Sequence, residues 1–339
     1  MAKMRKLPQR MCVGCRQMKN KKELISLIDG ALAITKGEEA CRAEFVKIQG
    51  LKARLAQNRY QLAVLGQFKR GKSTLVNALI GQEILPSSVI PVTAIPTFIS
   101  WGKTPGVEVR YLDQKAKRIQ FGSLDELCSF LVSAVSEEKN PCNAQGISRV
   151  EVFYPSPFLE QGVVLLDTPG IGSTHAHNTE TALAVLPECD GALFLISADP
   201  PITAAEVDYL GRIQAQASKI FILLNKIDYL TVPEIEKASQ FLRTVLREQL
   251  GLEDPRVFSL SARQGLEARL AGDSALWEKS GVARVSERLV GFLAAEKERA
   301  LVIALGSKLL GVLGDALLKL NLKARSLEIP LSQLEEKLQ

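Results

Sequence analysis

Residues 66–73 have the types and spacing of a loop that binds phosphate. They read Gly66-Gln67-Phe68-Lys69-Arg70-Gly71-Lys72-Ser73, followed by Thr74, and fit the pattern G-x-x-x-x-G-K-S. Backbone N–H groups of such a loop, together with a helix N-terminus, surround phosphate oxygens. Lys72 would add charge for the β and γ phosphates, and the Ser73 hydroxyl is a predicted Mg²⁺ ligand. The alternative is a chance glycine-rich turn, but an apolar run before the loop and a helix-like segment after it favour phosphate binding.

A second motif, Asp167-Thr168-Pro169-Gly170, follows the apolar run 163–166. An aspartate at the end of a strand can hold Mg²⁺ through a water, and the N–H of Gly170 can meet the γ phosphate. A threonine between the two motifs could reach the metal and close over the γ phosphate. Thr93 is the preferred candidate, Thr97 is its rival, and a purely structural threonine is the alternative. The predicted Mg²⁺ ligands are Ser73, Thr93 and Asp167.

A third motif, Asn225-Lys226-Ile227-Asp228, follows the apolar run 220–224. The Asp228 carboxylate can accept hydrogen bonds from N1–H and the exocyclic amine of guanine, a donor pair that adenine lacks, so this residue selects guanine. Asn225 would join the base edge to the phosphate loop, and the Lys226 stem can cover the ring. Ser261 and Ala262 fit the last base-contacting loop, where a backbone N–H meets the base oxygen. The predicted cofactors are therefore GTP or GDP and Mg²⁺.

The elements that carry these motifs predict an α/β fold. Short apolar runs without alternation, such as 163–166, 192–196 and 220–224, are typical of strands buried on both faces of a parallel sheet. Ligands bind at the carboxyl ends of such strands. We expect a Ras-like P-loop domain with a mostly parallel sheet and helices on both faces, joined to helical neck or stalk segments. The predicted organisation is a basic, poorly ordered head at 1–30, a neck helix at 31–58, the GTPase domain at 59–290, and at 291–339 the start of a helical neck or stalk that the chain truncates.

Charge and hydropathy restrict the partners and the location. The formal net charge is +6, but eight Lys and Arg residues against one Glu fall within residues 1–23, so the rest is near neutral. Any attraction to nucleic acid would therefore lie in the head, and we expect nucleic acid not to be a partner. The most apolar long stretch, 301–322, is interrupted by Lys308, Asp315 and Lys319, so we expect no membrane span. No secretory signal is visible, which favours a cytoplasmic location.

Four stretches resemble the dynamin family of GTPases, and specifically its bacterial dynamin-like members. They are residues 65–74, 91–97, 167–180 and 197–203, and the resemblance extends over residues 36–339 with its flanking helices. The resemblance implies hydrolysis of GTP to GDP and phosphate, self-association through GTPase heads, and remodelling or tethering of membranes. It also implies a location peripheral to the inner face of the cell membrane. The alternative function is a non-mechanical GTPase switch with a ribosome- or RNA-linked role.

The resemblance raises two questions of mechanism. Ile171 stands where Ras-like proteins have a glutamine that positions water, so the water must be held by other groups, as dynamin-like proteins achieve on dimerisation. Lys69 occupies the position of a cation-holding serine or an internal arginine finger in the resembling families. We predict that the Lys69 ammonium neutralises charge between the β and γ phosphates. A solvated loop charge is the alternative, and Arg70 could take the role instead.

Two further features have weaker interpretations. Residues 8–25, with Cys12 and Cys15, resemble the opening of the YlxR family of RNA-binding proteins, but a single C-x-x-C cannot complete a four-ligand zinc site. A relic, a fusion scar or a misplaced start is the favoured interpretation. His175 and His177 suggest a metal, but no Cys or carboxylate cluster completes a site in the sequence, so a mobile switch-loop role is preferred.

Overall fold

The computed structural model describes residues 21–86, 95–113, 115–136, 139–170, 182, 184–199 and 201–328. The chain divides into two compact units, Tyr60–Lys297 and a unit that joins Met1–Arg59 to Glu298–Gln339. The predicted head up to residue 20 and the segment from 329 onward lie outside the described residues.

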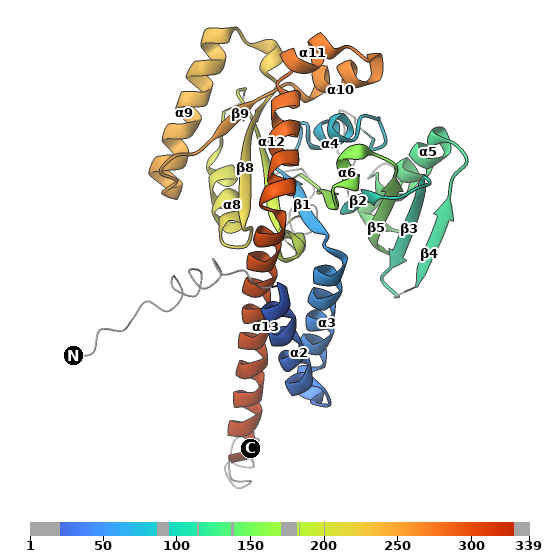
Figure 1. The fold of residues 1–339 in the computed structure, drawn as a ribbon, viewed down its shortest axis with the longest axis vertical. Helices are drawn as coiled ribbons and strands as arrows, with labels where there is room; N and C mark the ends of the chain where they lie inside the picture. The colour runs from blue at the N-terminus through green and yellow to red at the C-terminus, as the bar shows by residue number, and fades with distance from the viewer. Residues whose placement is uncertain are drawn as a thin grey trace, which may run out of the picture. The chain divides into compact units, whose positions relative to one another are not determined.

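Within the described part of unit Tyr60–Lys297, nine strands form one sheet in the order β4-β3-β5-β2-β6-β1-β7-β8-β9 (Figure 1). The central strands β6, β1, β7, β8 and β9 are mutually parallel, whereas β2 runs antiparallel to β6. The predicted mostly parallel α/β sheet is therefore confirmed. The strands are β1 (Tyr60–Leu65), β2 (Thr97–Trp101), β3 (Gly106–Tyr111), β4 (Ala116–Gln120), β5 (Ile147–Tyr154), β6 (Val163–Asp167), β7 (Gly191–Ser197), β8 (Lys219–Asn225) and β9 (Val257–Ser259).

The register of the central strands brings the motifs to one edge of the sheet. Val64 of β1 lies opposite Asp167 of β6, and Ser197 of β7 lies opposite Asn225 of β8. All four strands are parallel, so the loops that follow them leave from the same side. Because β1 and β6 are buried along their whole length, apolar side chains on both faces hold this register.

Helices cover both faces of the sheet. On one face, Tyr209 of α8 and Leu242 of α9 pack into a buried cluster with Phe194 of β7. On the other face, Phe292 of α12 makes edge-on ring contacts with Tyr60 and Phe221. The helices of this unit are α4 (Lys72–Ile80), α5 (Leu124–Val135), α6 (Pro157–Glu160), α8 (Ala204–Gln214), α9 (Val232–Leu250), α10 (Ala262–Ala271), α11 (Ser274–Lys279) and α12 (Val282–Ala295), with short 3-10 turns η2 (Pro141–Asn143), η3 (Leu186–Glu188) and η4 (Ile227–Tyr229).

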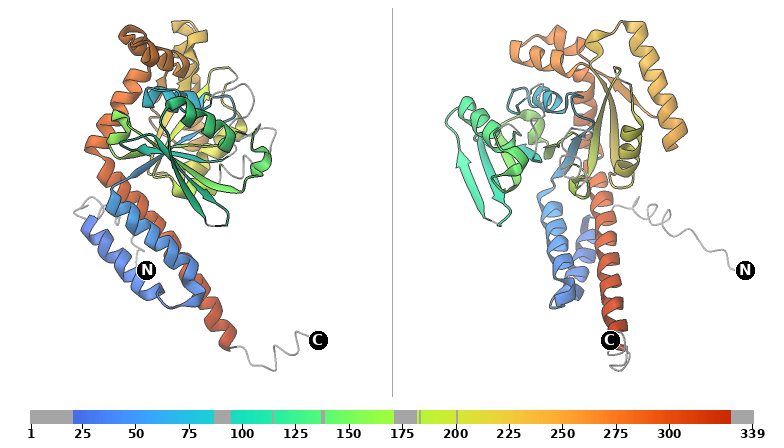
Figure 2. Two further views of the ribbon diagram at one scale, coloured as in Figure 1. Left: turned by 90° about the vertical axis from the view of Figure 1, so that its right-hand side faces the viewer. Right: turned by 180° about the vertical axis from the view of Figure 1, so that it is seen from behind.

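The second unit is a packed group of helices, α2 (Lys21–Thr35), η1 (Glu39–Cys41), α3 (Arg42–Gln57) and α13 (Lys297–Glu328) (Figure 2). Lys52 of α3 pairs with Asp29 of α2 at 2.7 Å, and Lys319 of α13 pairs with the buried Glu44 of α3 at 2.7 Å. The predicted boundaries after residues 30 and 290 fall inside α2 and α12, because a change in composition need not end a helix. The single neck helix expected at 31–58 is instead the end of α2 followed by η1 and α3.

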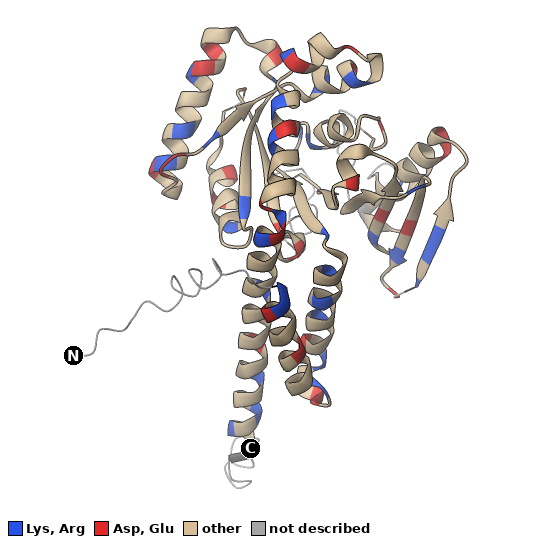
Figure 3. Ribbon diagram, viewed as in Figure 1, with Lys and Arg blue, Asp and Glu red and all other residues tan. Residues whose placement is uncertain are grey.

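Much of helix α13 carries neither Lys or Arg nor Asp or Glu (Figure 3). Residues Lys297–Ser326 are long and apolar enough to cross a membrane, with a mean hydropathy of 1.9 in the best window. The expected absence of a span stays a prediction. Length and composition do not distinguish a span from the core helix of a soluble protein, and a third of the window is buried within the structure.

Candidate functional site

The phosphate loop connects β1 to α4, the context that the sequence predicted. Lys72 is buried at the start of α4, and its Nζ donates to the carbonyl of Gln67 at 3.1 Å, so the side chain folds back over the loop. Gly71 has a φ of 89°, in the left-handed region, and a Cβ there would collide with Nδ2 of Asn225. Glycine is therefore required at position 71 both for the turn and for the approach of Asn225.

The surroundings of Lys72 weaken its hold on a proton. Burial, with a smaller contribution from Arg70, lowers the pKa of the Lys72 ammonium from 10.5 to about 8, although Asp167 and Glu206 act in the opposite direction. Burial disfavours the charged ammonium because water no longer surrounds it. The negative charge of a bound phosphate would favour the ammonium again and raise its pKa. The site is thus arranged so that Lys72 gains its full charge when an anion arrives.

Oxygen ligands gather at the other end of the loop. Ser73 Oγ donates to Asp167 Oδ2 at 2.8 Å, and Asp167 is buried at the end of β6. A hydroxyl and a carboxylate are hard oxygen donors of the kind Mg²⁺ prefers, so this pair fits that ion. Gly170 lies against the loop, because a Cβ on it would come within 2.6 Å of Phe68 Cα and 2.9 Å of Lys72 Nζ. The Gly170 backbone therefore lies beside Lys72, the residue predicted to bind the β and γ phosphates.

The third motif is tied to the phosphate loop by one side chain. Asn225 Nδ2 donates to the carbonyl of Arg70 at 2.7 Å, and Asn225 Oδ1 accepts from the backbone N–H of Ala262 at 2.9 Å. Ser261 caps α10 by accepting from the N–H of Gln264, which fixes the neighbouring turn. The Ala262 N–H already donates to Asn225 Oδ1. The predicted hydrogen bond from this loop to a base oxygen would therefore come from another backbone N–H, or from the Ala262 N–H donating to both oxygens.

Asp228 is occupied by a neighbouring arginine that sequence reasoning missed. Its carboxylate is only 2% exposed and accepts from Nη2 of Arg263 at 2.8 Å. The hydrogen bond raises the pKa of the Arg263 guanidinium. A guanidinium offers adjacent N–H donors, much as the N1–H and amine edge of guanine does. Lys226, in a left-handed conformation with a φ of 66°, precedes this carboxylate, and burial lowers the pKa of its ammonium.

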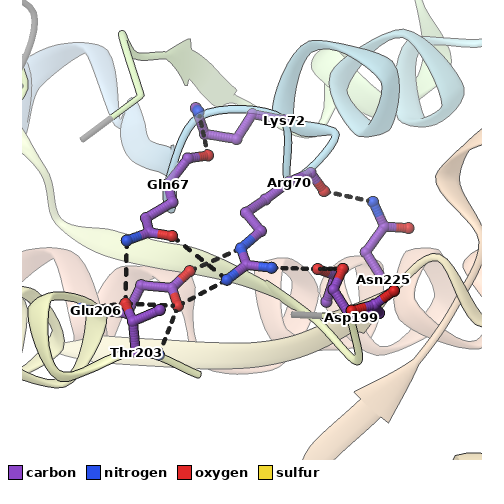
Figure 4. Close-up of polar contacts among 8 residues, drawn as sticks. Gln67, Arg70, Lys72, Asp199, Thr203, Glu206 and Asn225 are labelled. Carbon is purple, nitrogen blue, oxygen red and sulfur yellow. Dashed lines mark hydrogen bonds and ion pairs between the residues drawn. The ribbon is translucent and has the colours of Figure 1, made fainter. Parts of the chain in front are cut away.

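The two cations at positions 69 and 70 have opposite surroundings. Lys69 is exposed, has a φ of 64°, and places its ammonium 5.4 Å from the centre of the Phe68 ring. Arg70 is buried and ion-paired with Glu206 of α8 at 2.9 Å (Figure 4). The suggestion that Arg70 could replace Lys69 at the phosphates is therefore not supported, because the protein interior holds its guanidinium.

Several predicted residues lie outside the described part of the chain: Thr93, Ile171, His175 and His177. The rival Thr97 is buried in β2, where its Oγ1 donates to the carbonyl of Ile95 at 3.3 Å. Within the described ranges, no group of three or more His, Cys, Asp or Glu side chains could hold a metal ion. Thr93 as a metal ligand stays a prediction.

A glycine-rich phosphate loop, an aspartate at the next strand of the sheet, and an Asn-Lys-x-Asp motif at one edge define a P-loop protein of the GTPase class. Residues 62–228 match the dynamin family. A bacterial dynamin-like protein of Nostoc punctiforme is 30% identical over 264 residues, which cover 72% of this chain and 38% of the relative. The chain belongs to the dynamin family and is a GTPase of the bacterial dynamin-like kind.

Two further comparisons cover most of the chain. An uncharacterised protein encoded in the xynA 3′ region of Caldicellulosiruptor sp. is 35% identical over 291 residues, covering 85% of this chain and 70% of that protein. A chain from an oligomerised bacterial dynamin pair, described as a mechanism for long range sensing and tethering of membranes, superposes with a TM-score of 0.57 at 20% identity. That match covers 93% of this chain and 50% of the other, so it supports the fold. The comparisons give no support to a YlxR relationship for residues 8–25.

Proposed function

We propose that this chain binds GTP with Mg²⁺ at the phosphate loop, hydrolyses it to GDP and phosphate, and assembles through its GTPase domains at the inner face of a membrane. Membership of the dynamin family supports the reaction. The solved bacterial dynamin pair, described as oligomerised and as tethering membranes, supports the assembly and the association with a membrane. Because the chain spans only 38% of the Nostoc relative, the activity of the whole protein belongs to the proposal.

The residues divide the work of binding. Ser73 and Asp167 would hold Mg²⁺, which when bound neutralises charge on the β and γ phosphates. Lys72 and the N-terminus of α4 would hold the phosphate oxygens, with the backbone of Gly170 beside the γ phosphate. Asn225 orients the base edge, and Asp228 selects guanine.

The main observation in favour of assembly-dependent hydrolysis is the arrangement of the two cations Lys69 and Arg70 in the phosphate loop. Ile171 follows Gly170 in the sequence, and an aliphatic side chain cannot orient an attacking water. Arg70 is fixed in the interior, whereas Lys69 is exposed with its ammonium against Phe68. Of these two cations, Lys69 is therefore the one that can move toward developing charge when the surroundings of the loop change. A second GTPase domain docking on this edge would supply that change and exclude water.

The test is GTP turnover per molecule over a range of protein concentrations. Specific activity should rise with concentration, Lys72→Ala should abolish turnover, and Lys69→Ala should bind GTP yet lose the concentration-dependent rise. A low rate that is independent of concentration would contradict assembly and favour a switch that waits for a separate activator. Parental turnover in Lys69→Ala would refute the role of that ammonium.

Membrane association needs its own measurement. Flotation with anionic liposomes, with and without a non-hydrolysable GTP analogue, should show a nucleotide-dependent bound fraction. A variant that lacks residues 1–20 is the control, because a basic segment binds anionic lipid by charge alone. Binding that disappears with this deletion would contradict a dynamin-like membrane role.

A further inference from the structure

A buried ion pair joins the phosphate loop to helix α8. The Arg70 and Glu206 side chains are 3% and 0% exposed, and two parallel hydrogen bonds of 2.9 Å join Nε to Oε1 and Nη2 to Oε2 (Figure 4). This two-point geometry fixes the orientation of both groups.

The pair also joins the phosphate loop to the segment between β7 and α8. Nη1 of Arg70 donates to Ser197 Oγ, which in turn donates to the carbonyl of Asp199 at 3.0 Å. Glu206 Oε2 accepts from the backbone N–H of Thr203 at 3.0 Å, which completes the capping box of α8. One carboxylate thus anchors the loop and starts a helix.

The backbone beside this anchor faces the nucleotide site. The carbonyl of Arg70 accepts from Asn225, and the carbonyl of Gln67 accepts from Lys72. The Gln67 side chain is held as well, since its Nε2 donates to Thr203 Oγ1 at 3.0 Å. Movement of Arg70 would therefore displace the loop backbone that Asn225 and Lys72 contact, the residues proposed to bind the base and the phosphates (Figure 4).

A buried Arg–Glu pair is a poor source of stability, because the loss of hydration offsets the attraction between the charges. We propose that Arg70 is a positioning residue, and that Glu206 holds it so that the phosphate loop keeps its binding conformation before nucleotide arrives. The inference rests on guanine-nucleotide binding at this loop. Without the anchor, binding would have to order the loop, and ordering one backbone residue corresponds to about a tenfold loss of affinity.

The test removes both charges of the pair without leaving one of them buried alone. In Arg70→Met with Glu206→Gln, methionine fills similar space, and glutamine can still complete the capping box. The control is Arg149→Met with Glu188→Gln, which removes a more exposed Arg–Glu pair of 2.7 Å whose arginine stacks on Phe98. Both variants are made in the 339-residue chain, and their melting temperatures are recorded.

The readout is the dissociation rate of fluorescent methylanthraniloyl-GDP, chased with unlabelled GDP. We expect release about tenfold faster or more in the Arg70/Glu206 variant and parental release in the control, whatever their melting temperatures. Release within about threefold of the parent would overturn the inference, since a purely structural pair changes melting alone. A parent that binds no labelled GDP would instead refute nucleotide binding itself.

Discussion

Lys72 should take up a proton when nucleotide binds, because its charge depends on the phosphate. Burial lowers its pKa from 10.5 to about 8 in the unliganded chain. Phosphate oxygens favour the charged ammonium and so raise the pKa again. At about pH 8 half of the unliganded molecules carry a neutral Lys72, which must be protonated on binding.

The size of the effect follows from the pKa. Binding GDP should take up about half a proton at pH 8 and about a tenth at pH 7, if the bound ammonium is fully protonated. Recovering the ordinary pKa of Lys72 corresponds to about 3 kcal/mol, so affinity should fall about tenfold per pH unit above pH 8. The unliganded fold changes in the opposite sense: it gains stability from about pH 8 to 10.5, where the unfolded chain binds more protons.

Isothermal titration calorimetry in buffers of different ionisation enthalpy counts these protons directly. Lys72→Arg is the matched control, because a guanidinium stays protonated throughout this range and should show no uptake. Binding of GDP at pH 8 without proton uptake by the parent would refute the argument that burial lowers this pKa. Equal uptake by Lys72→Arg would assign the proton to another group.

Two further predictions concern ion pairs. Arg263→Ala should free the Asp228 carboxylate for guanine and raise GDP affinity by up to about fivefold, the modest worth of a pair whose arginine is exposed; weaker binding, measured by fluorescence titration, would instead show that Arg263 serves the bound base. Lys319 lowers the pKa of Glu44, so this pair stabilises the fold above about pH 4.5 and the stabilisation is lost as pH falls through the lowered pKa. Thermal denaturation at neutral pH should show a lower melting temperature for Lys319→Met, with the difference shrinking in acid; a constant difference would contradict this origin.

The central sheet and the motif positions followed from the sequence because each depends on a short stretch of chain. Apolar runs predicted β6, β7 and β8, and motif spacing predicted Ser73 beside Asp167. The basic charges of residues 1–23 do not indicate the start of α2, whereas the helical spacing of Leu24, Ile28 and Ala31, which are buried, does. Charge on an exposed face does not prevent a helix.

The ion pairs of the site could not be predicted in the same way. Arg70 and Glu206 are 136 residues apart, so their contact depends on β1 and β7 being neighbours with a fixed register. Thr203 and Glu206 do show the spacing of a capping box, which predicts the start of a helix but not the arginine that shares the carboxylate. Arg263 follows the predicted loop directly, yet nothing in its spacing places it on Asp228.

Arg70 could affect nucleotide binding by positioning the phosphate loop or by changing the charge of Lys72, and the pKa of Lys72 distinguishes the two. Glu206 raises the pKa of Lys72 and Arg70 lowers it, so the effects of removing both side chains on this pKa oppose each other. The Lys72 charge available to phosphate should therefore change little in the Arg70→Met, Glu206→Gln variant. Proton uptake at pH 8 should stay close to the parental value while GDP leaves faster. If uptake changed with release, the pair would act through the charge of Lys72, and positioning would not be needed to explain it.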